Sequence, residues 1–522
     1  MTSINRVIFK DTFFVTWMGW VATFLGFWLP VYMAGLFGAG NLTDAFFMAL
    51  SLIYLVSGIV NNPINSVVIP VFVDYRIKEP GEAGRIFGSS TLLLGLVSLA
   101  AILVIVVLVA ARPFPQLLGA QKDAVSLVMT MTMELLPMIP AAIFATFLAA
   151  TYGSFQKFGL SESIRGVHYI LVLVAMFLGH RAWGINSAII GHVVGALAEV
   201  ALAAWLVRTL DFTPAYTWRI HPAIRDMLRL SKYPMIGSCL LQFNPFLDRL
   251  MSLFTGQGNA SVLGYAEKVA LIPLLLLGTG FSSVILSHWS KYRALDQFDE
   301  VKQNFHTVVS LTVFLFLPVV LLILVFRLEI VEIIFLRGRF TAADAELTAK
   351  VLAALIPGSI PYMVVMVQVN VFLSQKNTLI PFLNGLLNVG LNITLNLALA
   401  FWLKLGVVGI GLSTSGTYLV LCLFLGRFLR QQGLHRFSRH SLVEGLRLIT
   451  AGLATCLVAY YFNMSARSWM IEFSLVPKTA LLAAMLSVGL VVYFGVSWLV
   501  KKPEVMMIKA FLSGKLRRTT AN

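Results

Sequence analysis

The chain alternates long apolar blocks with short polar connections. Each block runs for roughly 20 to 28 residues, which is long enough for a helix to cross about 30 Å of hydrocarbon. The pattern therefore predicts an all-α polytopic membrane protein with about 14 transmembrane helices. The predicted spans are 12–37, 43–73, 86–111, 124–152, 160–180, 183–207, 230–256, 263–288, 305–327, 347–373, 378–402, 406–430, 443–463 and 476–499.

Composition agrees with this pattern. Of the 522 residues, 58% are hydrophobic and only 12% are charged, whereas soluble domains carry about a quarter charged residues. A soluble globular enzyme is thereby excluded. The first block is too long for a signal-peptide core, so we expect it to be retained as a helix. Cys239, Cys422 and Cys456 lie in apolar segments without pairing or metal-ligand spacing, which predicts buried small side chains.

The net charge of +16 is distributed as a membrane protein requires. Lys and Arg gather in alternate short connections, which predicts that these connections and both termini are cytoplasmic. No basic domain interleaved with aromatic residues lies outside the apolar blocks, so we do not expect binding to nucleic acid. The expected surroundings are membrane lipids. The richest basic segments are 208–232, 427–447 and 501–518.

Two motifs recur at one spacing. Leu36-Phe37-Gly38-Ala39-Gly40-Asn41 resembles residues 253–259, about 217 residues later, and 139–143 resembles 356–360 at the same offset. This predicts two duplicated six-helix lobes with the same orientation, plus two C-terminal helices, an arrangement typical of transporters. The expected divisions are an N-terminal lobe (1–211), an amphipathic cytoplasmic connector (212–229), a C-terminal lobe (230–432), two further helices (433–500) and a basic tail (501–522).

Several ionisable residues fall inside the predicted spans. A charge at the bilayer centre costs roughly 2.5 to 3.5 kcal/mol on insertion scales, so each one needs a reason to be there. Asp248 and Arg249 lie in the seventh span, Glu267 and Lys268 in the eighth, and Asp44 at the start of the second. They are either substrate-binding residues or interhelical pairs, such as Asp248 with Lys268.

Polar residues without charge also gather in the second span. Asn61, Asn62 and Asn65 surround Pro63, which predicts a broken helix facing protein or a wet cavity. His168 and His192 are expected to be core histidines. No metalloprotease, nucleophile-elbow or Walker motif is present. Energy is therefore expected from the membrane potential, from a Na⁺ or H⁺ gradient, or from the substrate's own gradient, with no other cofactor.

Four stretches resemble one family. They are Gly38-Ala39-Gly40 followed by Thr43-Asp44-Ala45-Phe46-Phe47, then Tyr265-Ala266-Glu267-Lys268-Val269 with Pro273, then Gly338-Arg339-Phe340-Thr341, and the series Asn384, Asn388, Asn392 and Asn396. They are similar to segments of the MurJ (MviN) lipid II flippases. The similarity extends through most of the first twelve predicted spans.

The resemblance implies the fold of the multidrug/oligosaccharidyl-lipid/polysaccharide exporter superfamily, in the bacterial inner membrane. In the MurJ proteins two six-helix lobes face a cationic cavity, and segment 433–500 would form a groove for the lipid tail. Lys268 stands where the family has an essential arginine, and Glu267 where it has an aspartate. Proteins of envelope glycan synthesis are the partners that such a role implies.

This sequence also departs from the family. The positions of the two first-helix arginines hold Thr23 and Leu29, and that of the following aspartate holds Pro30. The second-helix arginine falls near Ser57 or Gly58. Loss of this positive charge weakens binding of an anionic headgroup. The substrate implied is an undecaprenyl-pyrophosphate-linked saccharide, either a polysaccharide repeat unit or lipid II.

We therefore expect an alternating-access flippase. Lys268 and Arg249, beside Glu267 and Asp44, are the expected pyrophosphate site. Asn61, Asn62 and Asn65 are expected to bind sugar hydroxyls. A sodium site is expected from the oxygen ligands of Asp248, Asn384, Asn388 and Thr414. The alternatives are a drug/cation antiporter of the same superfamily and a non-transporting scaffold or enzyme of an envelope glycan complex.

Overall fold

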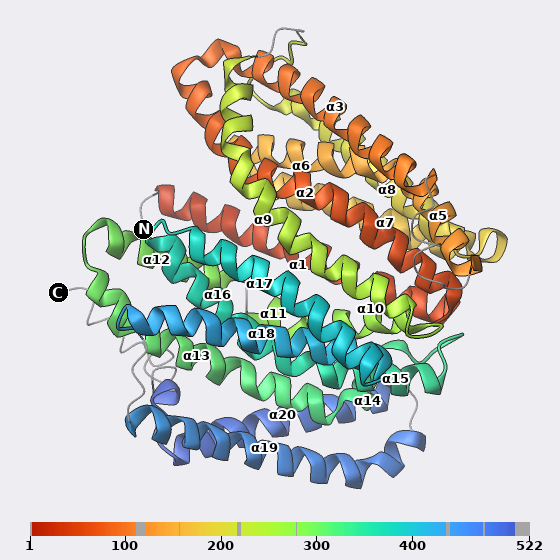
Figure 1. Cartoon of the computed structure of the whole chain (residues 1–522), viewed down its shortest axis with the longest axis vertical. Coiled ribbons are helices and arrows are strands. Elements are labelled where there is room, and N and C mark those ends of the chain that lie inside the picture. Colours follow the sequence, from red (N-terminus) through yellow and green to blue (C-terminus); the bar gives the residue numbers. More distant parts are fainter. Residues whose placement is uncertain are drawn as a thin grey trace. The chain divides into compact units, whose positions relative to one another are not determined.

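The computed structural model describes residues 3–110, 122–155, 157–216, 221–277, 279–434, 439–472 and 475–506. These residues form helices joined by short connections, with no β-strand among them (Figure 1). The first half holds α1 (Ser3–Phe37), α2 (Asn41–Lys78), α3 (Ala83–Ala110), α5 (Lys122–Leu135), α6 (Met138–Ser154), α7 (Phe158–Trp183), α8 (Asn186–Leu206) and α9 (Pro222–Leu253).

The second half is more interrupted. It holds α10 (Asn259–Ala270), α11 (Ile272–Leu277), α12 (Thr279–Ala294), α13 (Phe298–Val325), α14 (Arg327–Phe335), α15 (Ala342–Leu355), α16 (Ser359–Ser374), α17 (Leu379–Asn396), α18 (Gly406–Gln431), α19 (Arg439–Glu472) and α20 (Leu475–Leu499). A π-helical turn, Leu397–Trp402, extends α17. The all-helical class predicted from the sequence is confirmed.

The helices that can cross a membrane number fewer than predicted. Within the described residues, 11 are long and apolar enough, or up to 12 if the pair α5 and α6, bent by 45°, is one span. The predicted count of 14 is therefore not confirmed. The two predicted spans that fall short are 230–256, in α9, and 263–288, divided among α10, α11 and α12. These two segments carry the charged residues Asp248, Arg249, Glu267 and Lys268, which lower their apolar character.

Some helix boundaries differ from those of the predicted spans. Helix α9 begins at Pro222 and not near 230, because the His221 imidazole accepts a hydrogen bond from the Ala223 amide and caps the helix. Part of the expected connector is thus helical. The predicted break at Pro63 is also absent, since α2 is continuous through it. The division between the fifth and sixth spans is confirmed by Gly184, whose positive φ of 54° ends α7.

Packing divides the chain into two units. Unit 1 holds Met1–Gly264 and Arg337–Phe340, and unit 2 holds Tyr265–Leu336 and Thr341–Asn522. In unit 1, α9 packs along α2, and α7 packs against both α1 and α8. Within this unit a cluster of aromatic rings packs together, formed by Phe72, Phe87, Phe147, Phe155 and Phe212. The predicted lobes and connector remain predictions.

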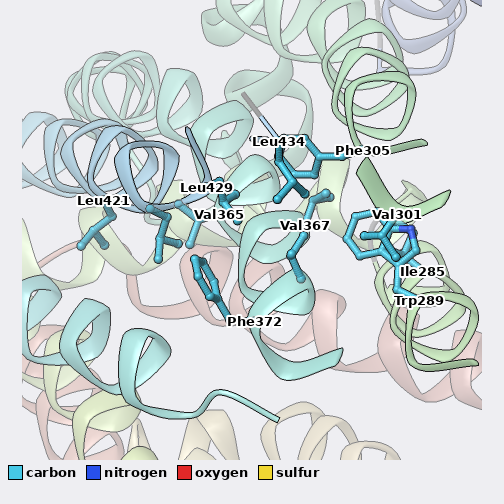
Figure 2. Close-up of a cluster of buried hydrophobic side chains, with 12 residues drawn as sticks. Ile285, Trp289, Val301, Phe305, Val365, Val367, Phe372, Leu421, Leu429 and Leu434 are labelled. Carbon is cyan, nitrogen blue, oxygen red and sulfur yellow. The ribbon is translucent and has the colours of Figure 1, made fainter. Parts of the chain in front are cut away.

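Unit 2 has an apolar core of its own. Figure 2 shows side chains from α12, α13, α16 and α18 that meet there, among them Trp289, Phe305, Val367 and Leu429, each less than 3% exposed. Helices α19 and α20 lie side by side and pack on α13 (Figure 1). The Tyr493 hydroxyl donates to the Phe314 carbonyl at 2.9 Å and fixes α20 against α13.

Candidate functional site

Unit 1 contains a cavity of about 490 Å³ within its helical bundle. Helices α2, α6, α7 and α8 line it. The wall from α6 is formed by small residues on one helix face, including Ala142, Ala145 and Ala149, which are three to four residues apart. Because their side chains are short, space is left between α6 and the polar side chains of α2, α7 and α8.

Two of the predicted sugar-binding asparagines face this cavity. Asn61 and Asn65 line it from α2, whereas Asn62 is exposed and is not among the lining residues. The Asn61 Oδ1 atom is buried and has no hydrogen-bond partner among the described residues. A buried acceptor without a partner is costly unless a water or ligand satisfies it. The cavity therefore offers an acceptor for a hydroxyl group.

A chain of titratable side chains reaches the cavity from the opposite wall. His168 Nε2 lies 3.3 Å from His192 Nδ1, and His168 Nδ1 lies 3.8 Å from Glu199 Oε2. Both histidines are less than 10% exposed, as predicted for core histidines. His168 and Glu199 nevertheless line the cavity. A purely structural role, as expected from the sequence, does not account for the place of His168 at the cavity wall.

The sequence does hold a signal for this cluster. Arg165, His168 and Tyr169 are three and four residues apart on α7, and His192 and Glu199 are seven apart on α8, so each set shares a helix face. Arg165 and Tyr169 also line the cavity. What one sequence cannot show is that these two faces meet. The Glu162 side chain lies outside the described residues.

Asp44 has a structural partner. Its carboxylate accepts hydrogen bonds from the Gly258 amide at 2.5 Å and the Ser261 amide at 2.7 Å, with the Ser261 hydroxyl at 2.9 Å. Asp44 is 3% exposed. The carboxylate thereby joins the start of α2 to the start of α10, where orphan helical amides need an acceptor. These bonds hold the loop before α10, and the expected role of Asp44 in substrate binding remains a prediction.

Arg249 on α9 lies close to residues of α2 and α10. Its guanidinium carbon is 5.2 Å from the centroid of the Phe47 ring, a cation–π contact. A Cβ atom at Gly264 would lie 2.9 Å from one of its guanidinium nitrogens, so glycine makes room for the arginine. Asp248, the preceding residue on α9, is 6% exposed. The proposed roles of both residues remain predictions.

Lys268 lies in the last turn of α10 in unit 2. Its positive charge is favourable there because the carbonyl ends of a helix carry partial negative charge. Lys268 and Glu267 are half-buried, while Tyr265 is fully buried, with its ring centroid 5.2 Å from that of Phe335. The buried residues fix the helix end, and the two charged residues lie on its more exposed face.

The predicted sodium ligands on α17 and α18 differ in their hydrogen bonding. Asn384 is 7% exposed, and its Oδ1 atom has no hydrogen-bond partner among the described residues. Such an oxygen fits a cation ligand. Asn388 lies one turn along α17, and the Thr414 hydroxyl on α18 bonds the Ile410 carbonyl at 3.1 Å. By contrast, Asn396 donates to Asn392 within the helix at 3.1 Å.

The positions of the missing arginines hold side chains that pack. Leu29 is 8% exposed and Ser57 is 2% exposed, with the Ser57 hydroxyl bonded to the Ile53 carbonyl at 2.7 Å. The Thr23 hydroxyl bonds the Gly19 carbonyl at 2.8 Å. These hydroxyls are satisfied by their own helices, so the positions carry neither positive charge nor free donors.

Comparison with known proteins gives a consistent result. The family model described as lipid II flippase MurJ matches residues 33–480. A probable lipid II flippase MurJ of Rickettsia prowazekii is 22% identical over 515 residues, covering 95% of this chain and 98% of that protein. The corresponding protein of Vibrio cholerae is 23% identical over 516 residues, covering 95% and 96%.

Solved structures show the same fold. A lipid II flippase MurJ in an inward closed conformation matches with a TM-score of 0.76 and 19% identity, over 97% of this chain and 99% of that one. An inward-facing multidrug resistance MATE family transporter of the MOP superfamily matches with a TM-score of 0.67 and 14% identity, over 79% and 95%. The expected superfamily fold is confirmed.

Proposed function

Because the chain belongs to the MurJ family of lipid II flippases, we propose that it moves an undecaprenyl-pyrophosphate-linked saccharide across the cytoplasmic membrane of a bacterium. Transport runs from the inner to the outer leaflet. The observation that carries the proposal is the family match over residues 33–480. It is supported by the match of the whole fold to a flippase of that family.

The saccharide is the finer part of the proposal. Neutral side chains fill the family's first-helix and second-helix arginine positions, and Leu29 and Ser57 among them are buried. Lys268 at the end of α10 and Arg249 on α9 are the cations proposed for the pyrophosphate. Asn61 and Asn65 line a cavity that suits hydroxyl groups. Few cationic side chains together with a cavity for hydroxyl groups favour a headgroup that needs fewer cations than lipid II, such as a polysaccharide repeat unit.

Depletion of the protein in its native cell tests the function. Undecaprenyl-linked lipids are then quantified by mass spectrometry. Accumulation of a lipid-linked oligosaccharide with unchanged lipid II supports a polysaccharide flippase. Accumulation of lipid II identifies a peptidoglycan flippase and shows that lipid II transport does not require the missing arginines. An unchanged lipid pool contradicts the function altogether.

Orientation and coupling complete the proposal. The basic connections 208–232 and 427–447 support cytoplasmic termini, and labelling of single introduced cysteines from outside the cell tests this. We further propose that Asn384 and Asn388, with Thr414 and Asp248, hold a sodium ion whose gradient drives transport. The buried Oδ1 of Asn384 supports the site. A bound sodium ion would supply a fixed positive charge within the membrane.

A further inference from the structure

The His168 ring has polar neighbours on both sides, which a purely structural core histidine does not require. It is 8% exposed on α7, and one ring nitrogen points to a second imidazole while the other points to a carboxylate. All three groups, His192, His168 and Glu199, belong to unit 1. The series begins in the packed interior at His192, which is 5% exposed and lies against the Phe46 ring, and ends at the cavity with Glu199.

The donor and acceptor pattern of this series favours proton binding. An ionised carboxylate only accepts hydrogen bonds, so Nδ1 of His168 has to carry hydrogen for a favourable contact with Glu199. Nε2 of His168 then either accepts from His192 or, when protonated, donates to it. The same geometry therefore accommodates both the neutral and the protonated ring. His168 Nδ1 and the Glu199 carboxylate are 3.8 Å apart, close enough for the charge of one group to influence protonation of the other.

The other titratable groups near His168 and Glu199 are less suited to take up the proton. Arg165 on α7 lines the cavity and supplies positive charge, which favours an ionised Glu199. Tyr54 on α2, Tyr152 on α6 and Tyr169 on α7 are the phenols at the cavity, and phenols titrate far above neutral pH. Residues 17–37 of α1 contain no Asp, Glu, Lys, Arg or His, and Glu134 on α5 is exposed and is not among the lining residues.

We propose that the series His192–His168–Glu199 is a proton-binding site of unit 1, loaded from the cavity. A proton that enters adds to the pair of His168 and Glu199 and raises its net charge by one. The added charge draws the His168 Nδ1–H and the Glu199 carboxylate together and so changes the contact between α7 and α8. Uptake and release of this proton accompany movement of the lipid-linked substrate, a step that rests on the proposed function.

The proton site itself is tested without substrate. Full-length protein labelled with ¹⁵N-histidine is placed in lipid nanodiscs, and the signal lost in His168→Gln identifies His168 among the eight histidines. We expect that signal to shift as the pH is varied. In Glu199→Gln its midpoint falls by about one pH unit, since the nearby negative charge is removed. An unchanging signal, or an equal midpoint in Glu199→Gln, overturns the site.

Coupling is tested in proteoliposomes with the undecaprenyl-linked lipid that accumulates on depletion, carrying a fluorescent label. One pH unit across the membrane gives a ~10-fold ratio of proton activity, worth about 1.4 kcal/mol. We expect wild-type transport to change several-fold with that gradient, and His168→Gln and Glu199→Gln to lose the response. His288→Gln, at an exposed position on α12, is the matched control and retains it.

Different results contradict the proton coupling and the proposed lipid transport. Transport by the wild type that ignores the pH gradient overturns the coupling. Absence of any lipid transport contradicts the proposed function, while the histidine titration still decides whether the proton site exists.

Discussion

Asp44 and Ser261 are hydrogen-bonded to one another although 217 residues separate them. That separation equals the offset at which the sequence motifs recur. Asp44 lies in the first turn of α2 and Ser261 in the first turn of α10, so a carboxylate at the start of one helix accepts amides at the start of the other. The duplication itself remains a prediction.

Removal of this carboxylate is expected to destabilise the protein. Asp44→Asn replaces one accepting oxygen by a donor that faces the Gly258 and Ser261 amides. The expected loss is about 3 kcal/mol, because buried amides lose a charged acceptor. Thermal unfolding of the purified protein in detergent measures it. Asp74→Asn is the control, since Asp74 on the same helix is 51% exposed and forms a surface pair with exposed Lys78. Equal stability of the two variants would show that Asp44 is free to serve substrate binding instead.

Lys268 is expected to matter for transport and not for folding. Its ammonium lies at the end of α10, and a charge-assisted hydrogen bond to a pyrophosphate is worth about 1.5 to 3 kcal/mol. Lys268→Ala should therefore lower transport of the labelled lipid about tenfold or more, with an unchanged melting temperature. Lys350→Ala serves as control, because Lys350 is 59% exposed in a surface pair with Glu346. Wild-type transport by Lys268→Ala removes this residue from the mechanism.

The apolar pattern predicted most of the helices, and its failures have a common physical reason. Span length follows from hydrophobic thickness, so the apolar helices α3 and α20 were predicted within a few residues. Helices α9 and α10 are stabilised by contacts within protein, including the loop held by Asp44. Their boundaries follow from caps and packing, which hydropathy does not measure.

The site was predicted only in part, for a related reason. A single sequence shows that Asn61, His168 and Glu199 lie within the membrane, but it does not show how each helix is rotated. Asn61 was assigned to a cavity and lines one. His168 was assigned to the core, because nothing in the spacing of α7 and α8 shows that it lies opposite Glu199. Contacts between helix faces decide such roles.

The second residue of the predicted basic tail, Lys502, is buried. The Lys502 side chain is 1% exposed and lies 2.8 Å from the Glu444 carboxylate and 3.6 Å from that of Glu504. Loss of one partner in a buried ion pair leaves an uncompensated charge and costs about 3 kcal/mol. Lys502→Gln should therefore lower the melting temperature, whereas Lys501→Gln, at the exposed neighbouring position, should not. Equal melting temperatures would show that this network contributes no stability.

Sodium is expected to stabilise the protein through Asn384. A ligand that binds the folded state raises its stability in proportion to the logarithm of concentration above the dissociation constant, about 2.7 kcal/mol at a hundredfold excess. The buried Oδ1 of Asn384 is available for this. Melting temperature should thus rise with sodium chloride more than with potassium chloride at equal ionic strength. Asn384→Ala and Asp248→Asn should each reduce the difference between the two salts.

The comparison of salts decides between two roles for α17. Asn392 and Asn396 already bond one another, so the same ladder also serves as internal hydrogen bonding. If both salts act equally on the wild type, Asn384 and Asn388 belong to that structural role and sodium has no site here. If the difference disappears in both variants, Asn384 and Asp248 are both required for the sodium effect. The driving ion is then separable from the proton at His168, whose variants should leave the sodium effect unchanged.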